Sequence, residues 1–233
     1  MKVLFSIYQW FIDIPLMILL TIFISIIVIV GCAISNKSFA YYPTKFWGWA
    51  ICKTLFVKVT VIGSENVDSK TSYVFIANHQ SAFDIWAICG HMKHSCKWMM
   101  KKSLEKIPFV GMACKAAGYI MVDHSSPAAV SETMANASKQ LQNGASLVVF
   151  PEGSRTKDGK MHPFKKGAFK LATEFGLPLV PITIDGAYDV MRRGSYQIHP
   201  GHITLTIHKP MSPLSADIIQ ETYEIIESAL REA

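Results

Sequence analysis

Several catalytic motifs are missing from this sequence of 233 residues. There is no G-x-S-x-G nucleophile elbow, which a lipase-type serine hydrolase would carry. Neither a P-loop nor a G-x-G-x-x-G fingerprint occurs, so nothing indicates a nucleotide-binding enzyme. The five cysteines include no C-x-x-C pair, and their odd number predicts reduced thiols on the cytosolic side of a membrane instead of a disulfide framework.

Acidic residues are also scarce, because 17 Asp and Glu stand against 23 Lys and Arg. The resulting net charge of +6 and isoelectric point near 9.0 suit contact with anionic lipid, with phosphate groups or with an acidic carrier protein. Nucleic acid would be another partner for a basic chain. However, no recognised nucleic-acid-binding motif accompanies the charge, so we expect no nucleic-acid partner.

Charged residues are absent altogether from Ile14 to Asn36. As a helix this stretch would be about 34 Å long, against roughly 30 Å of hydrocarbon in a bilayer, which predicts a membrane segment. A cleaved signal peptide is disfavoured, because the segment before the apolar run offers only Lys2, Asp13 interrupts it, and no A-x-A site follows.

Lysines follow the apolar run, and the positive-inside rule therefore predicts that the globular part lies on the cytoplasmic side of the membrane. The next segment, Tyr41 to Val57, is rich in Phe, Trp and Tyr with spaced lysines, as in an interfacial amphipathic helix. Two arrangements stay open from the sequence: a helix that spans the bilayer, and a helical pair that enters one leaflet.

Beyond residue 57 the sequence alternates short β-rich runs with helical ones, which predicts an α/β fold: a single mixed sheet covered by helices and preceded by the membrane-embedded helical segment. We therefore divide the chain into membrane-associated helices at 1–57 and one catalytic domain at 58–233. The expected strands are Val59–Ile62, Tyr73–Ala77, Lys97–Met100, Tyr119–Val122, Ser146–Phe150, Leu179–Thr183 and Ile203–Ile207. The expected helices are Ala82–Gly90, Ser126–Asn143, Lys166–Phe175 and Ser215–Arg231.

A histidine and a carboxylate follow the second of these strands, in the run Asn78-His79-Gln80-Ser81-Ala82-Phe83-Asp84. Inside one helix, His79 and Asp84 would lie about 140° apart, so they can meet only if His79 precedes the helix and Asp84 lies in its first turn. Asp84 would then orient the imidazole and stabilise its protonated form while the other ring nitrogen acts as a general base. The competing interpretation is an S-x-x-D capping box, with Ser81 as the cap and no catalytic role for the histidine.

A second polar run, Pro151-Glu152-Gly153-Ser154-Arg155, follows the fifth expected strand. Gly153 lacks the Cβ that would keep a ligand from the backbone, and the guanidinium of Arg155 matches the oxygens of a phosphate. These residue types indicate an anion site. A glycine turn with a solvated arginine is the plain alternative.

The two runs together resemble the glycerolipid acyltransferase family, which carries H-x4-D and E-G-T-R, and within it the 1-acylglycerol-3-phosphate acyltransferases. Ser154 stands where the family has Thr, a change that keeps a hydroxyl. Lys101 begins a segment similar to the family's K-x-x-L-x-x-x-P-x-x-G block, which implies that Lys101 and Arg155 hold the phosphate of the acyl acceptor.

The resemblance implies a membrane-bound enzyme of phospholipid biosynthesis that moves a fatty acyl group from a thioester to the sn-2 hydroxyl of lysophosphatidic acid, giving phosphatidic acid. His79 and Asp84 would be catalytic, and Lys101, Glu152, Gly153, Ser154 and Arg155 would bind the substrate, with Glu152 and Gly153 shaping the turn. Acyl-CoA and acyl carrier protein both remain as donors. No cofactor is implied.

Two other functions compete with this interpretation. The same motifs could serve another lysolipid acceptor, such as a lysophospholipid or a lyso-aminolipid, or the chain could be a catalytically idle lipid-binding protein anchored to the membrane. Separately, Cys89, His91, His94 and Cys96 have the side chains of metal ligands. Their spacing is tighter than that of structural zinc sites, so we expect no metal.

Overall fold

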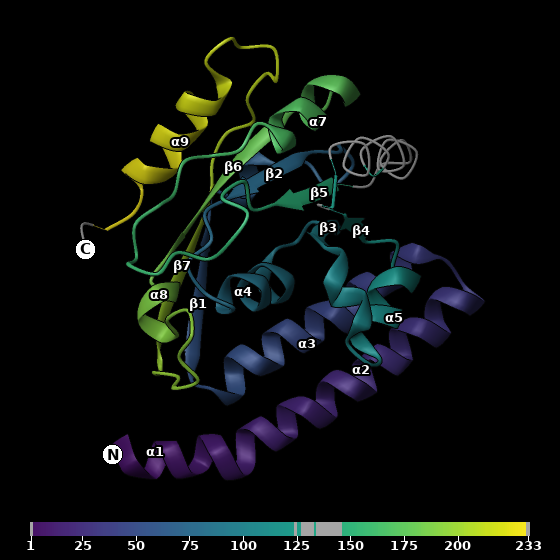
Figure 1. The fold of residues 1–233 in the computed structure, drawn as a ribbon, viewed down its shortest axis with the longest axis vertical. Coiled ribbons are helices and arrows are strands. Elements are labelled where there is room, and N and C mark those ends of the chain that lie inside the picture. Colours follow the sequence, from purple (N-terminus) through teal and green to yellow (C-terminus); the bar gives the residue numbers. More distant parts are fainter. Residues whose placement is uncertain (1, 124, 127–132, 134–145, 232–233) are drawn as a thin grey trace.

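The structure is a computed structural model that describes residues 2–123, 125–126, 133 and 146–231. Its centre is a seven-stranded sheet (Figure 1) in the order β1-β7-β6-β2-β5-β3-β4. The strands are β1 (Val57–Ile62), β2 (Val74–Ala77), β3 (Cys96–Lys101), β4 (Ile120–Val122), β5 (Ser146–Val149), β6 (Leu179–Asp185) and β7 (Gly201–Ile207). The seven expected strands are confirmed, with ends that differ by at most two residues.

The sheet is mixed, as expected. Strands β6, β2, β5, β3 and β4 run parallel to one another, whereas β7 is antiparallel to β6 and parallel to β1. The carboxyl ends of β2, β5 and β3 therefore lie at the same edge of the sheet. In open α/β sheets this edge is where ligands bind.

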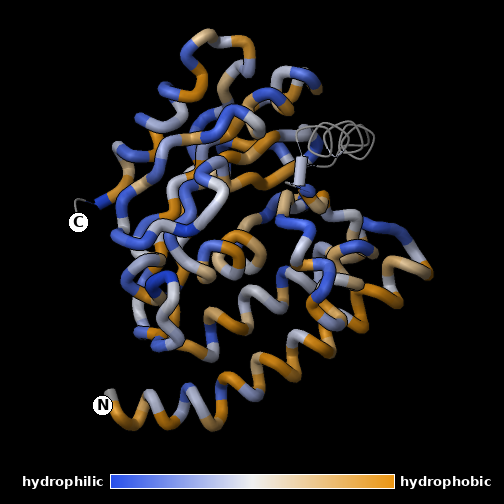
Figure 2. The backbone as a smooth tube through the Cα atoms, in the orientation of Figure 1, coloured by the Kyte–Doolittle hydropathy of each residue, from blue (hydrophilic) through white to orange (hydrophobic). Residues whose placement is uncertain are grey.

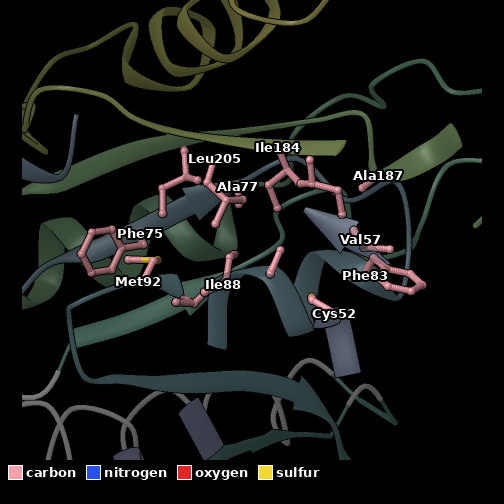
Figure 3. Close-up of a cluster of buried hydrophobic side chains, with 14 of the residues drawn as sticks. Cys52, Val57, Phe75, Ala77, Phe83, Ile88, Met92, Ile184, Ala187 and Leu205 are labelled. Atoms are coloured by element: carbon pink, nitrogen blue, oxygen red, sulfur yellow. The ribbon is translucent and has the colours of Figure 1, made fainter. Parts of the chain in front are cut away.

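Helices cover both faces of the sheet because its central strands are apolar on both sides. In β2, Phe75 and Ala77 face a core that includes α3 and α4 (Figure 3), whereas Val74 and Ile76 face α7 and α9. The helices are α3 (Tyr41–Thr54), α4 (Phe83–His91), α5 (Val110–Ala116), α7 (Gly167–Phe175), α8 (Ala187–Val190) and α9 (Ile218–Ser228). Short 3-10 turns are η2 (Lys37–Ala40), η3 (Ser64–Asn66) and η4 (Lys102–Lys106).

Three of the four helices expected beyond residue 57 are confirmed as α4, α7 and α9. The expected helix Ser126–Asn143 lies almost entirely outside the described residues. The sequence did not indicate α5 and α8. Both are short, and α5 consists largely of small residues that pack against the N-terminal helix.

The N-terminal helix is continuous through α1 (Lys2–Tyr8), a π-helical turn η1 (Gln9–Asp13) and α2 (Ile14–Ile34). Its stretch Val3–Ile34 is long and apolar enough to cross a membrane. It runs along one side of the molecule (Figure 2), with an outer surface of exposed Val, Leu, Ile, Phe and Trp side chains. Its inner surface, which includes Ile24 and Val28, packs against Ala113 and Ala117 of the α5 region.

Helix α3, which the expected division at residue 57 groups with the N-terminal helices, packs into the same core as the sheet. Ile51 and Leu55 are fully buried in the same cluster as Phe75. Helix α3 crosses α4 at a glycine pair so close that a Cβ on Gly48 would lie 2.7 Å from the backbone nitrogen of Gly90. One of the helices expected to associate with the membrane is therefore needed to bury the sheet.

Candidate active site

Two loops meet at the carboxyl edge of neighbouring strands, one after β2 and one after β5. The first carries His79 and leads into α4, which holds Asp84 in its first turn. The second carries Glu152, Gly153 and Arg155. The spacing argument is confirmed, since His79 precedes the helix and Asp84 lies within it.

The imidazole of His79 is hydrogen bonded to the carboxylate of Asp84, with 2.8 Å between Nδ1 and Oδ2. The side chain of His79 is 14% exposed, whereas that of Asp84 is fully buried. Because an ionised carboxylate can only accept, Nδ1 donates and the neutral ring keeps its lone pair on Nε2. No hydrogen bond to Nε2 comes from the part of the chain that the structure describes. The ring can therefore take a proton from a bound molecule.

Asp84 also caps the loop that carries His79. Its Oδ2 atom accepts hydrogen bonds from the backbone nitrogens of Gln80 and Ser81, at 2.7 and 2.8 Å. The capping and catalytic interpretations are thus compatible, because one oxygen serves both. Ser81 itself is not the cap in the expected position: α4 begins at Phe83, and the Ser81 hydroxyl donates to the carbonyl of Met191 at 2.7 Å while accepting from the Phe83 nitrogen at 3.3 Å.

Neighbouring side chains fix the plane and position of the imidazole. The ring of Phe150 stacks on that of His79, with centroids 3.9 Å apart and planes at 8°. Asn78 is fully buried, and its side-chain amide pairs with both backbone groups of Ile184, at 2.9 and 2.7 Å, as an extra strand residue would. The histidine loop is therefore attached to β6 on one side and to the end of β5 on the other.

Glu152 links the two motifs through the backbone of His79. Its Oε1 atom accepts from the His79 nitrogen at 2.7 Å, and its Oε2 atom accepts from the His162 nitrogen at 2.9 Å. The His79 carbonyl in turn accepts from the Thr156 nitrogen at 3.0 Å. Burial raises the pKa of the Glu152 carboxyl, although these backbone donors act in the opposite direction. Glu152 is thus a support for the histidine loop.

The turn that follows β5 requires a glycine. The Gly153 nitrogen donates to the Phe150 carbonyl at 3.1 Å, which closes a turn with Pro151 as its second residue. Gly153 has a φ of +75°, a backbone conformation that favours glycine. A Cβ on Gly153 would lie 2.6 Å from the Nζ atom of Lys165. The missing Cβ therefore leaves room for an ammonium group at the turn, and Lys165 is a basic residue of the site that the sequence did not assign.

The other expected substrate-binding residues lie around this edge of the sheet. Lys101 is exposed and ends β3, next to β5. Ser154 and Arg155 are half-buried after the turn, and the Arg155 carbonyl accepts from the Arg193 guanidinium at 2.6 Å. Lys102, by contrast, pairs with Asp123 at 2.9 Å.

Sequence reasoning missed the supporting contacts of Asn78, Phe150 and Thr156. Asn78 and Phe150 were visible as a polar residue directly after a buried strand and an aromatic residue at the end of another. Their roles depend on the adjacency of β2 to β5 and β6, which a single sequence does not specify.

Both polar runs, at residues 78–84 and 151–155, lie in a region that matches a known protein family. The sequence model of a family described as Acyltransferase matches residues 58–185. The 1-acyl-sn-glycerol-3-phosphate acyltransferase BAT2 of Brassica napus, a chloroplastic protein, is 35% identical over 186 residues, which are 79% of this chain and 54% of that protein. The chloroplastic enzyme LPAT1 of Arabidopsis thaliana is 34% identical over 79% of this chain and 52% of its own. The chain thus spans about half the length of these curated relatives.

A solved structure is similar over nearly the whole chain. The crystal structure of the 1-acyl-sn-glycerophosphate acyltransferase PlsC from Thermotoga maritima superposes with a TM-score of 0.75 and 26% sequence identity. The superposition covers 93% of this chain and 95% of that protein. The similarity therefore extends beyond the matched domain to the N-terminal helices.

Proposed function

This chain belongs to the acyltransferase family, and from that premise we propose that it transfers a fatty acyl group from an acyl thioester to the sn-2 hydroxyl of lysophosphatidic acid, giving phosphatidic acid. The observation that carries the proposal is the His79–Asp84 pair with Nε2 available, held by backbone hydrogen bonds against the Glu152–Arg155 run. This arrangement supports a general base and an anion site next to each other at one edge of the sheet.

In the proposed reaction, Nε2 of His79 removes the proton as the acceptor hydroxyl attacks the thioester carbonyl. The new C–O bond forms a tetrahedral intermediate, whose collapse breaks the C–S bond. The proton then passes from the imidazolium to the departing thiolate. Asp84 stabilises the imidazolium between these two steps, and no side chain is acylated.

The acceptor phosphate is bound, in this proposal, by Arg155 and Lys101, with Lys165 as a third cation at the Gly153 turn. A phosphate monoester carries up to two negative charges, and charge-assisted hydrogen bonds from several donors neutralise it better than one. Ser154 adds a hydroxyl beside them. Because both oxygens of Glu152 accept from backbone nitrogens, its part in substrate binding is indirect.

We also propose that the N-terminal helix lies in one leaflet of the membrane. Gln9 bonds to the backbone at Tyr196 and Ile198, whereas Ile24 packs against the α5 region. These contacts are 15 residues apart, about 22 Å along a helix. A helix that crossed the bilayer would carry one of its ends away from the domain, so contacts at both points favour a helix parallel to the membrane surface, with the domain on the cytoplasmic side.

The test is product analysis with the purified full chain in mixed micelles. Lysophosphatidic acid, lysophosphatidylcholine and a lyso-aminolipid are offered separately with acyl-CoA or acyl carrier protein. We expect phosphatidic acid to form at least tenfold faster than the other products. Faster acylation of another lysolipid would identify that lysolipid as the acceptor. If no pair of substrates gave thioester cleavage, the chain would be a lipid-binding protein and not an acyltransferase.

A further inference from the structure

A groove of about 510 Å³ lies between the last turn of α3 and the start of β1, away from the motifs described above. Strand β1 is at the end of the sheet, three strands from β2, or about 14 Å at the usual spacing. None of the expected site residues lines the groove. The reaction therefore gives no explanation for it.

The groove is basic on one side. Lys53 and Lys58 line it, both are exposed, and neither forms an ion pair within the described part of the chain. His91 lines it too, but burial lowers the pKa of His91, so the positive charge at neutral pH comes from the two lysines. No lining residue is acidic. The groove thus favours an anion.

The other side of the groove is aromatic and continues into the apolar surface. Trp49 and Phe56 line it and are 44% and 62% exposed. Tyr42 and Phe46, which are also exposed, share one side of α3 with Trp49 at helical spacing, and Phe56 follows two residues after the helix ends. The Phe56 ring also contacts Phe5 and Tyr8 of α1, at centroid distances of 6.3 and 5.8 Å. The groove therefore opens beside the N-terminal membrane helix.

We propose that this groove binds the headgroup of an anionic phospholipid of the surrounding bilayer. Lys53 and Lys58 hold its phosphate, and Trp49 and Phe56 cover the glycerol and the start of the acyl chains. Tryptophan side chains prefer this boundary between headgroups and hydrocarbon, phenylalanine side chains suit its apolar side, and lysines there are attracted to anionic lipid. A free phosphate ion would leave the aromatic side unoccupied, which is why the phospholipid is the better occupant.

Fluorescence quenching of Trp49 tests this directly. The full chain is mixed with micelles that contain brominated phosphatidylglycerol or brominated phosphatidylcholine, and a Trp49→Phe variant isolates the signal of Trp49 from that of the other tryptophans. We expect the anionic lipid to quench at about a fivefold to thirtyfold lower mole fraction, since each lysine near an anionic surface contributes about a fivefold preference.

The double variant Lys53→Gln/Lys58→Gln should lose this preference, whereas Lys70→Gln/Lys209→Gln, in exposed lysines outside the groove, should retain it. Glycerol phosphate, which has no acyl chain, should not displace the lipid. Equal quenching by the two lipids, a preference that survives in the groove variant, or displacement by glycerol phosphate would each overturn the proposal. Because no catalysis is measured, these outcomes are independent of the acyl transfer reaction.

Discussion

At the scale of single residues, the carboxylate of Asp84 has two roles, because it orients the His79 imidazole and also caps the loop that carries His79. Oδ2 carries the His79 imidazole and two backbone nitrogens, whereas Oδ1 is buried without a hydrogen-bond partner among the described residues. Leaving a buried charged oxygen unpaired lowers stability. A fixed negative charge behind the imidazole is, however, what stabilises the protonated ring during proton transfer.

Substitutions at Asp84 should separate these tasks. In Asp84→Asn an amide oxygen can still accept from the loop, but the charge is lost, so we expect near-normal stability and a fall in kcat on the order of 100-fold or more. Asp84→Ala should lose activity and also about 1–3 kcal/mol of unfolding free energy, because buried backbone donors lose their acceptor. Turnover and denaturant unfolding of the purified variants measure both effects. An active Asp84→Asn enzyme would reduce Asp84 to a cap.

Arg155 should act on the acceptor and not on the donor. Loss of a charge-assisted hydrogen bond costs about 1.5–3 kcal/mol, so Arg155→Ala should raise KM for lysophosphatidic acid roughly 10- to 100-fold and change KM for the acyl thioester little. Lys102→Ala is the matched control, because the Lys102 ammonium pairs with Asp123 at the surface. Steady-state kinetics with each substrate varied in turn decide the matter, and equal effects on both KM values would contradict this role.

At the scale of elements, a buried histidine connects β2 and β5. Ser146 of β5 accepts from the Tyr73 nitrogen at 3.0 Å and lies 2.6 Å from Nε2 of His94. The Ser146 hydroxyl can then donate its hydrogen bond to Nε2 of His94, provided that Nε2 is unprotonated. Burial lowers the pKa of His94, although Asp68 and the backbone of Thr71 act in the opposite direction. The neutral His94 ring thus helps to hold β5 against the residue that precedes β2.

This linkage predicts the sign of a pH effect. The pKa of His94 is lower in the folded state than in the unfolded chain, so the unfolded state takes up a proton first as the pH falls. The contribution of the neutral ring to folding stability is therefore complete above about pH 6.5. It is lost as the pH falls through the folded-state pKa. In His94→Gln, where the amide can still accept but cannot titrate, Tm should fall less between pH 7.5 and 5.5 than in the wild type. Thermal unfolding at the two pH values measures this, and equal falls would show that His94 does not contribute.

The sequence predicts the strands and the longer helices themselves, but not which of them are neighbours. Seven strands followed from short β-rich runs, and the meeting of His79 with Asp84 followed from the loop-to-helix spacing. The backbone bonds from His79 to Glu152 and Thr156 could not be foreseen, because they depend on which strands are neighbours. Likewise, the aromatic residues of α3 suggested only a membrane surface, whereas its close crossing with α4 at Gly48 and Gly90 buries its other side.

At the scale of the whole molecule, the N-terminal residues occupy two different structural environments. Helices α1 and α2 have an exposed apolar surface, whereas α3 completes the core. Removing the fully buried side chains of Ile51 and Leu55 would cost about 2–5 kcal/mol each, which is comparable to the total stability of a domain. An anchor that can be removed without damage to the fold must therefore end before α3.

Two deletions test this division. Deletion of residues 2–36 should reduce binding to bilayers and activity on embedded acceptor, yet preserve a cooperative unfolding transition and activity on a short-chain, monomeric acceptor. Deletion of residues 2–57 should abolish the transition and all activity. Vesicle flotation, calorimetry and assays on both acceptors compare the two proteins. A folded and active chain without residues 2–57 would mean that α3 is dispensable for the core.

The proposed reaction depends above all on the imidazole of His79 as the base that activates the acceptor hydroxyl. Its most direct test is the rate of phosphatidic acid formation by the full-length His79→Ala variant, with saturating lysophosphatidic acid and acyl thioester and with Tm measured on the same preparation. Without the His79 side chain, Oδ2 of Asp84 still accepts from the backbone nitrogens of Gln80 and Ser81, so we expect the variant to remain folded, with a modest fall in Tm. We expect a rate at least about 100-fold below that of the wild type. A folded variant that turns over at the wild-type rate would contradict it.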